Sequence, residues 1–305
     1  MNPESTPGEG QPFPVGSAPD SWGVWFPDDP LQTPWTRFLD EIAEAGYEWV
    51  ELGPFGYLPT DPQELKVELD KRGLRLSGGT VGGALHRPEE LPAIRQSMLE
   101  VARLASALGA KHLVFLPSMY RGLKDGAPLE PAELSAEQWH SLVSGAEHLA
   151  RVLLEETGMR FCFHPHAESH VETDEQIERF LADTDPELVG LCLDTGHVAY
   201  AHGDAPRIAR EHPDRVWYVH IKSVDPEVLA KVVADGLSFA DAVKLGVMCE
   251  PSRGIPPLGQ MRAAIAKLPA GTFVVVEQDL YPCDVGHPLP IALRTRKALQ
   301  EAGIG

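Results

Sequence analysis

Short apolar runs alternate along the chain with longer segments in which apolar residues recur every three or four positions. The short runs are typical of buried β-strands, and the longer segments are typical of amphipathic α-helices. The apolar runs predict strands at residues 15–18, 49–52, 75–78, 112–116, 160–164, 189–194, 216–221 and 273–277. The periodic segments predict helices at residues 35–45, 62–72, 89–108, 136–156, 174–182, 205–211, 258–267 and 290–302.

This alternation predicts an α/β fold with parallel strands, because each helix is long enough to return the chain across the sheet. The simplest architecture is a single (β/α)8 TIM barrel at residues 13–305, preceded by a flexible N-terminal tail at residues 1–12. A doubly wound open sheet is the alternative, and it is disfavoured because no G-x-G-x-x-G follows an early strand. We interpret the glycine-rich residues 77–86, SGGTVGGALH, as a flexible active-site loop.

One connection, at residues 222–271, is much longer than the others. It has helical patterns at residues 227–235 and 239–245, followed by the loop sequence GVMCEPSRGIPPLG. Long connections on a barrel usually serve as lids or binding loops, so we expect this insert to contribute to function.

The net charge and composition disfavour several classes of binding partner and site. The net charge of −19 disfavours a nucleic acid or an anionic membrane, because both would be repelled. No apolar run approaches the roughly 20 residues of a membrane span. The cysteines are widely spaced without a C-x-x-C pair, which disfavours a thiolate zinc site and fits a reduced, cytoplasmic setting.

The last four predicted strands each end in or next to polar residues. Alternation along each strand places His164, Asp194, His220 and Glu277 on the inward face at the carboxyl end. The carboxyl ends of barrel strands meet at one face, where the active sites of this fold lie. Two imidazoles and two carboxylates suit a divalent metal, with Mn²⁺ or Co²⁺ foremost and Zn²⁺, Fe²⁺ or Mg²⁺ as alternatives.

A single histidine at a strand end is ordinarily a solvated or hydrogen-bonded residue. Four successive strands that all end in ligand-type residues favour a metal site instead. The sequence does not decide which residue after the fifth strand binds the metal, because His166 and Glu168 follow His164 within a few residues.

These motifs resemble the xylose-isomerase-like superfamily of metal-dependent TIM barrels, in particular D-T-G-H at residues 194–197 and V-H-x-K at residues 219–222. The nearer resemblance is to the myo-inosose dehydratases, alongside sugar phosphate isomerase and epimerase-like proteins. It is carried by APDSWGVW at 18–25, VELGPFGYLP at 50–59, HPHAESHVET at 164–173, TDPELVGLCLDTGH at 184–197 and VWYVHIKSV at 216–224. The resemblance covers most of the chain.

The resemblance implies that Asp194, His220 and Glu277 bind the metal. Many superfamily members have a glutamate in place of His164, and ketose epimerases pair that glutamate with the one on strand eight. Its absence here favours loss of water over epimerisation. The residues expected to transfer protons are His164, His166, Glu277 and Lys222, and those expected to bind substrate are Glu51, Trp22, His197, Lys222 and Arg253.

We therefore expect a metal-dependent lyase that dehydrates a 2-keto inositol (inosose), or a related keto-cyclitol or keto-sugar, through an enediolate. The first alternative is a metal-dependent sugar or inosose isomerase or epimerase. The second is a non-catalytic carbohydrate-binding barrel. The expected partner is a small molecule, and barrels of this size often form homo-oligomers.

Overall fold

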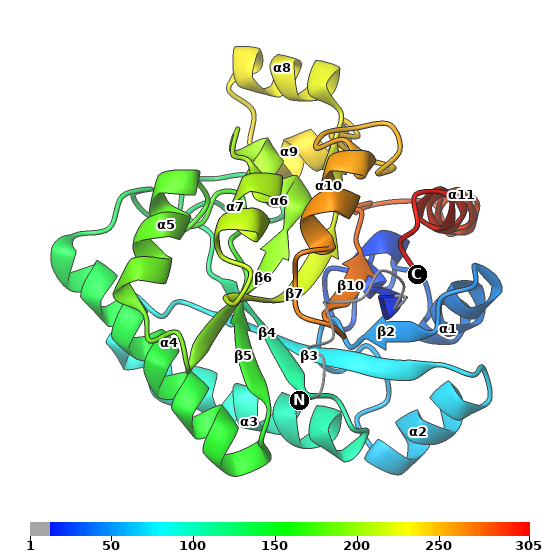
Figure 1. The fold of residues 1–305 in the computed structure, drawn as a ribbon, viewed down its shortest axis with the longest axis horizontal. Coiled ribbons are helices and arrows are strands. Elements are labelled where there is room, and N and C mark those ends of the chain that lie inside the picture. The colour runs from blue at the N-terminus through cyan, green and yellow to red at the C-terminus, as the bar shows by residue number, and fades with distance from the viewer. Residues whose placement is uncertain (1–12) are drawn as a thin grey trace, which may run out of the picture.

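Parallel strands close into a barrel in the computed structural model, which describes residues 13–305 (Figure 1). The predicted tail at residues 1–12 lies outside the described residues. The order around the barrel is β1-β10-β7-β6-β5-β4-β3-β2, so the predicted TIM barrel is confirmed and the open sheet is wrong. The barrel strands are β1 (Val15–Ser17), β2 (Trp49–Glu51), β3 (Arg75–Gly83), β4 (His112–Pro117), β5 (Arg160–Phe163), β6 (Val189–Asp194), β7 (Val216–Ile221) and β10 (Phe273–Val276).

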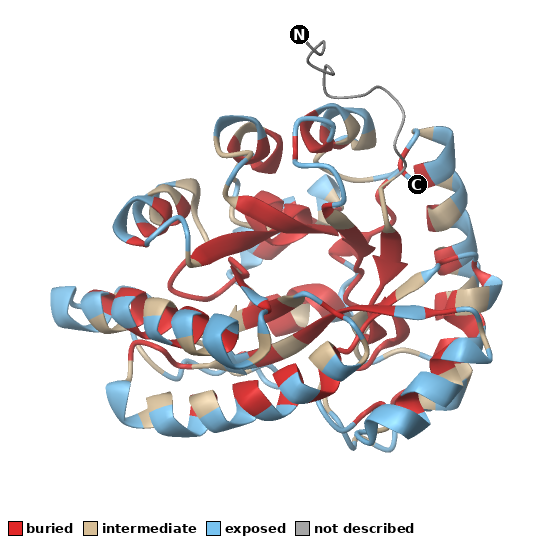
Figure 2. Ribbon diagram, turned by 60° about the horizontal axis from the view of Figure 1, so that its bottom comes forward, coloured by how far each residue is buried: buried red, intermediate tan, exposed pale blue. Residues whose placement is uncertain are grey.

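The helices surround this barrel and turn their apolar faces towards it, as the burial colours of Figure 2 show. They are α1 (Trp35–Glu44), α2 (Pro62–Asp70), α3 (Leu91–Ala107), α4 (Ala136–Thr157), α5 (Asp174–Asp183), α7 (Ala205–Glu211), α10 (Leu258–Ile265) and α11 (Pro288–Glu301). Capping boxes at Ser135 and Thr173 fix the starts of α4 and α5, as S/T-x-x-Q sequences predict. A short helix that the pattern did not predict, α6 (Thr195–Tyr200), follows β6 directly.

The glycine-rich segment was wrongly interpreted as a loop, because β3 continues through it to Gly83 and pairs with all of β4. Its glycines serve close packing. A Cβ on Gly79 would lie 2.7 Å from Val101 of α3, and one on Gly83 would lie 2.6 Å from Ile94. The glycines on this face of β3 therefore let α3 approach the strand.

The long connection at residues 222–271 forms a small layer over the carboxyl end of the barrel. It contains β8 (Ser223–Val224), α8 (Pro226–Asp235), α9 (Phe239–Lys244) and β9 (Met248–Cys249), followed by α10. Strands β8 and β9 pair antiparallel, and α8 and α9 pack on a separate apolar cluster that includes Ala167, Leu229 and Phe239. Helix α10 packs on the main core instead, through Met261, Ala264 and Ile265. The insert is thus folded onto the same face of the barrel as the strand ends.

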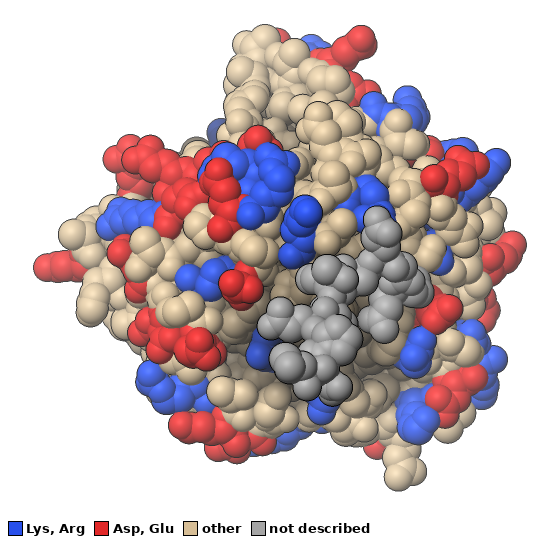
Figure 3. Space-filling view, viewed as in Figure 1, with Lys and Arg blue, Asp and Glu red and all other residues tan. Residues whose placement is uncertain are grey.

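Both signs of charge occur on the surface. Figure 3 shows Lys and Arg interspersed with Asp and Glu on the face viewed in Figure 1. Within residues 13–305, the helices lack the length and apolar character that a membrane crossing requires.

Candidate metal centre and active site

A cavity of about 420 Å³ opens at the carboxyl ends of the barrel strands. Its polar lining comes mostly from the barrel strands and the segments that follow them, and Phe239 of the insert lines one side. The titratable residues from these strands and segments are Asp20, Glu51, His164, His166, His197, His220, Lys222, Glu277 and Asp279. This is the face on which enzymes of this fold carry their active sites.

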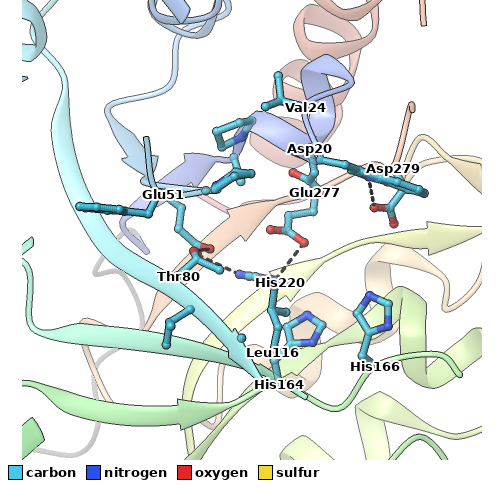
Figure 4. Close-up of a pocket in the computed structure, with 18 of the residues that line it drawn as sticks. Asp20, Val24, Glu51, Thr80, Leu116, His164, His166, His220, Glu277 and Asp279 are labelled. Carbon is cyan, nitrogen blue, oxygen red and sulfur yellow. Dashed lines mark hydrogen bonds and ion pairs between the residues drawn. The ribbon is translucent and has the colours of Figure 1, made fainter. Parts of the chain in front are cut away.

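Four residues from four neighbouring strands or strand ends converge beside this cavity, and Figure 4 shows three of them, His164, His220 and Glu277. One ligand-type atom from each of His164, Asp194, His220 and Glu277 lies within 4.8 Å of the others. Asp194 Oδ2 is 3.4 Å from His164 Nε2 and 3.7 Å from His220 Nδ1, and Glu277 Oε2 is 3.0 Å from His220 Nδ1. The structure therefore brings together the four residues that alternation along the strands selected.

Four side-chain atoms of these residues are buried and have no hydrogen-bond partner among the described residues: both ring nitrogens of His164, Asp194 Oδ2 and His220 Nδ1. Three of them face one another, since Asp194 Oδ2 lies between His164 Nε2 and His220 Nδ1 at the distances given above. Unpaired buried polar atoms are costly, and a shared cation would satisfy all three at once. The donor set of two imidazoles and two carboxylates also fits a divalent ion, so the residues present suit the metal that the sequence predicts.

The D-T-G-H motif positions this cluster through each of its residues. Asp194 Oδ1 accepts hydrogen bonds from the backbone N–H of Gly196 and His197, both at 2.8 Å, and so caps α6 while Oδ2 faces the cluster. Thr195 Oγ1 donates to the carbonyl of Lys222 at 2.6 Å. A Cβ on Gly196 would lie 2.5 Å from Lys222 Cγ, so only glycine leaves room for that side chain.

Lys222 is a buried cation among carboxylates. Its side chain is 2% exposed, and Nζ lies 2.9 Å from Asp279, 3.1 Å from Glu277, 3.4 Å from Asp194 and 3.7 Å from Asp20. Burial lowers the pKa of Lys222, but Asp194 and the other carboxylates outweigh burial and raise it well above its usual value. Burial likewise opposes ionisation of Asp194, but the charge of Lys222 brings its pKa down to about 2.

His166 and His197 lie on the rim of the cluster with ring centroids 3.8 Å apart. Burial lowers the pKa of His166 to about 3 and that of His197 well below its usual value, so both rings are neutral near pH 7. His166 Nδ1 donates to the carbonyl of Ala167 at 2.7 Å, because a carbonyl can only accept. The lone pair of His166 is therefore on Nε2, and this ring can accept a proton.

Two carboxylates in the cavity were not assigned from the sequence, Asp20 in the motif APDSWGVW and Asp279 two residues beyond the last predicted strand. Asp20 follows β1, and its Oδ2 has no hydrogen-bond partner among the described residues. Burial and the neighbouring Glu277 raise the pKa of Asp20 well above its usual value. Asp279 Oδ1 accepts from Trp25 Nε1 at 3.2 Å, and burial raises its pKa as well.

Three sequence-predicted site residues lie away from the cluster. Trp22 is fully buried and donates from Nε1 to Glu41 at 2.8 Å, so it belongs to the core and Trp25 is the tryptophan that lines the cavity. Arg253 is exposed and outside the cavity lining. Glu168 turns away from His164 and accepts from the backbone N–H of Phe239 at 2.9 Å, which leaves His164 as the strand-five member of the cluster.

Sequence reasoning did not find Phe239, because the apolar pattern of α9 alone does not show which residue reaches the cavity. Its ring centroid lies 5.4 Å from that of His166 and 5.1 Å from that of His197. We expect Phe239→Ala to loosen both rings and lower kcat/KM by about tenfold or more, at a stability cost of about 3 kcal/mol. Phe239→Leu, which retains most of the volume, is the control. Equal kinetics for the Ala variant and the wild type would show that Phe239 is only a core residue.

A second imidazole–carboxylate cluster joins three loops at the same end of the barrel. Glu130 lies 3.0 Å from His86 Nε2, 3.2 Å from His170 Nε2 and 2.7 Å from Arg87 Nη2. Burial raises the pKa of Glu130, but hydrogen bonds from Arg87, His86 and His170 outweigh it and lower the pKa to about 2. This cluster anchors the loop that carries His164 and His166.

The lowered pKa of Glu130 predicts a pH dependence of stability. The folded state binds the proton less readily than the unfolded state, so the stabilisation is complete above about pH 4.5 and is lost as the pH falls towards 2. Glu130→Gln should cost about 1–2 kcal/mol at pH 7 and flatten this dependence. Urea unfolding between pH 3 and pH 7 measures both effects. Parallel curves for the variant and the wild type would contradict the assignment.

The fold and this site define a TIM barrel with a candidate metal centre at its carboxyl face. Residues 39–301 match the family described as Xylose isomerase-like TIM barrel, and the chain belongs to that family. This confirms the family resemblance of the sequence motifs.

Individual relatives were also found. The chain is 32% identical to an inosose dehydratase of Geobacillus kaustophilus over 92% of each chain. Among solved structures it resembles a zinc-bound IOLI protein, with a TM-score of 0.70 and 15% identity over 96% of this chain and 98% of that one. It also resembles a D-psicose 3-epimerase of Clostridium cellulolyticum H10, with a TM-score of 0.66 and 15% identity over 95% of this chain and 97% of that one. The two solved structures show the fold alone.

Proposed function

We propose that this protein is a divalent-metal-dependent hydro-lyase that removes water from a 2-keto inositol. The observation that carries the proposal is a four-residue cluster suited to a metal beside neutral imidazoles and a buried cation in one cavity. The similarity to an inosose dehydratase over nearly the full length supports the substrate class. A cavity of about 420 Å³ is in the usual range for small-molecule sites.

Dehydration requires that a proton leave the carbon beside the ketone and that the hydroxyl on the next carbon depart. A divalent ion held by His164, Asp194, His220 and Glu277 would act as a Lewis acid that polarises the ketone and acidifies this C–H. His166 is the proposed base, since it is neutral and its Nε2 carries the lone pair. The proposal thus divides the two expected roles of the strand-five histidines, with His164 as ligand and His166 as base.

The departing hydroxyl needs a proton. Asp20 is the proposed acid, because it lines the cavity, its Oδ2 is free of hydrogen bonds among the described residues and its raised pKa favours the protonated form. Lys222 and His197, whose Nζ and Nε2 lie 3.1 Å apart, would hold the substrate oxygens. The C–H and C–O bonds break, the double bond forms between the two carbons, and one water is released without a redox step.

Asp20→Asn tests the acid role with little change in shape. We expect kcat to fall by about 10²- to 10⁴-fold, the usual contribution of a general acid, while the metal content stays unchanged. Rates with substrate analogues that carry better β leaving groups should fall less. If kcat were unaffected, Asp20 would not be the proton donor.

The product distinguishes this function from the alternative. The resemblance in fold to a D-psicose 3-epimerase makes an isomerase or epimerase the second candidate. Incubation of metal-loaded protein with 2-keto-myo-inositol in deuterated buffer should give a product lighter by one water, and substrate recovered before completion should carry deuterium at the carbon beside the ketone. A product of unchanged composition with a moved carbonyl or inverted centre would make the protein an isomerase or epimerase. Absence of any turnover across this substrate and a panel of ketoses would support a binding protein.

A further inference from the structure

Glu51 ends β2 and reaches across the barrel mouth to His220 on β7. Its Oε2 lies 3.0 Å from His220 Nε2, and its Oε1 accepts from Thr80 Oγ1 at 2.7 Å. Glu51 and His220 are each 1% exposed. Strands β2 and β7 are separated by β1 and β10 in the barrel order, so this contact crosses the interior between strands that do not pair.

The contact between Glu51 and His220 determines which ring nitrogen of His220 carries the proton. An ionised carboxylate can only accept hydrogen bonds. His220 Nε2 must therefore carry a proton and donate the hydrogen bond to Glu51. In a neutral ring the lone pair is then on Nδ1. Nδ1 is the nitrogen that faces the cluster, 3.7 Å from Asp194 Oδ2 and 3.0 Å from Glu277 Oε2, without a hydrogen-bond partner among the described residues.

Thr80 fixes the orientation of the Glu51 carboxylate through a hydrogen bond. It lies on β3 between Gly78 and Gly82, and its hydroxyl occupies the Glu51 oxygen that His220 does not use. Figure 4 shows Glu51 and Glu277 approaching His220 from different sides, with Thr80 next to Glu51. Both oxygens of Glu51 are therefore engaged within the protein, although a substrate contact was expected from the sequence.

We propose that Glu51, held by Thr80, is a positioning residue that orients His220 so that it binds the metal through Nδ1. Carboxylate partners of metal-binding histidines fix the tautomer and ring orientation, and their loss typically weakens metal affinity about 10- to 100-fold. The inference rests on the proposed metal-dependent function. It concerns metal binding, however, and does not depend on which substrate is used.

Metal titration of the apo protein tests this role without any substrate. Calorimetry with Mn²⁺ should show affinity about 10- to 100-fold weaker in Glu51→Ala and a smaller loss in Glu51→Gln, whose amide oxygen can still accept from Nε2. Thr80→Val should weaken binding modestly, and Thr80→Ser, which keeps the hydroxyl, should not. Circular dichroism checks that each variant is folded. Unchanged affinity in a folded Glu51→Ala variant would overturn the proposal.

The tautomer gives a second measurement that does not require a variant at Glu51. In zinc-loaded protein with ¹⁵N-labelled histidine, the His220 signal, assigned by its loss in His220→Gln, should show a proton on Nε2 and a metal-shifted Nδ1. A proton on Nδ1 would overturn the inference. Failure of the protein to bind zinc or Mn²⁺ at all would overturn it together with the proposed function, whereas a bound metal with no dehydratase activity would count against the function alone.

Kinetics separate positioning from substrate binding. If Glu51 acts through His220, saturating Mn²⁺ should restore kcat in Glu51→Gln, with KM close to that of the wild type. If Glu51 instead binds a substrate hydroxyl, KM should rise while metal affinity is unchanged, and the proposal fails.

Discussion

Asp194→Ala should abolish metal binding, so that elemental analysis falls from about one divalent ion per chain to near zero and turnover is lost with it. Asp194 is fully buried, and its Oδ2 lies 3.4 Å from His164 Nε2. Removal of this carboxylate takes away one of four proposed ligands and a negative charge that offsets Lys222. The loss of a ligand from an open site of this kind removes most of its affinity.

The control for this variant follows from the second role of Asp194. The Ala substitution also removes the cap of α6, which costs about 1 kcal/mol regardless of metal. Asp194→Asn keeps an oxygen for the backbone N–H groups of Gly196 and His197 but removes the charge. We expect Asn to restore stability without restoring the metal. In thermal unfolding, Mn²⁺ at 100 times its Kd should stabilise the wild type by about 2.7 kcal/mol and neither variant. Full metal content in Asp194→Asn would rule out the assignment of this ligand.

His166→Ala should lower the rate of proton loss from the substrate by about 10²- to 10⁴-fold while about one metal remains bound per chain. The reason is that Nε2 of His166 carries the accepting lone pair in a neutral ring, whereas His164 belongs to the cluster. Deuterium wash-in at the carbon beside the ketone measures this step directly, before water is lost. Loss of the metal together with the activity would instead make His166 a ligand.

The control for His166→Ala is the same substitution at a histidine outside the site. His148 lies exposed on α4, so His148→Ala should leave both exchange and metal content unchanged. Exchange at the wild-type rate in His166→Ala would transfer the role of base to another residue.

Much of the fold could be predicted because each strand and helix carries a local pattern. The bounds of β6 and β7 match the prediction, since each apolar run ends at or next to a polar residue. Those of α7 match because Asp204 caps its first turn. β3 was cut short because glycine is the usual sign of a turn, and its use for packing against Val101 and Ile94 depends on a helix far along the chain. α6 was missed because its first turn depends on a side-chain cap from Asp194.

Part of the site could likewise be predicted from the sequence, and part could not. Strand alternation and the position of the strand ends placed His164, Asp194, His220 and Glu277 together, because these are geometric rules of a parallel barrel. Alternation does not reveal partners from opposite sides of the barrel, so the contact of Glu51 with His220 could not be predicted. Trp22 and Trp25 stand three positions apart in one motif, and only the turn after β1 determines that Trp25 reaches the cavity.

The glycines of β3 also shape one wall of the cavity. A barrel interior is normally filled by layers of side chains, and Gly82 contributes none to the layer at the mouth. Thr80 and Gly82 line the cavity on one side, and His164, His220 and Glu277 line it from other strands. The charged side chains of the cavity thus come mainly from other strands, while β3 contributes backbone at Gly82. A Cβ at position 82 would lie 3.0 Å from the carbonyl oxygen of Leu116, the residue that pairs with Gly82 on β4. The close pairing of two neighbouring strands beside the cavity therefore depends on a residue that has no side chain.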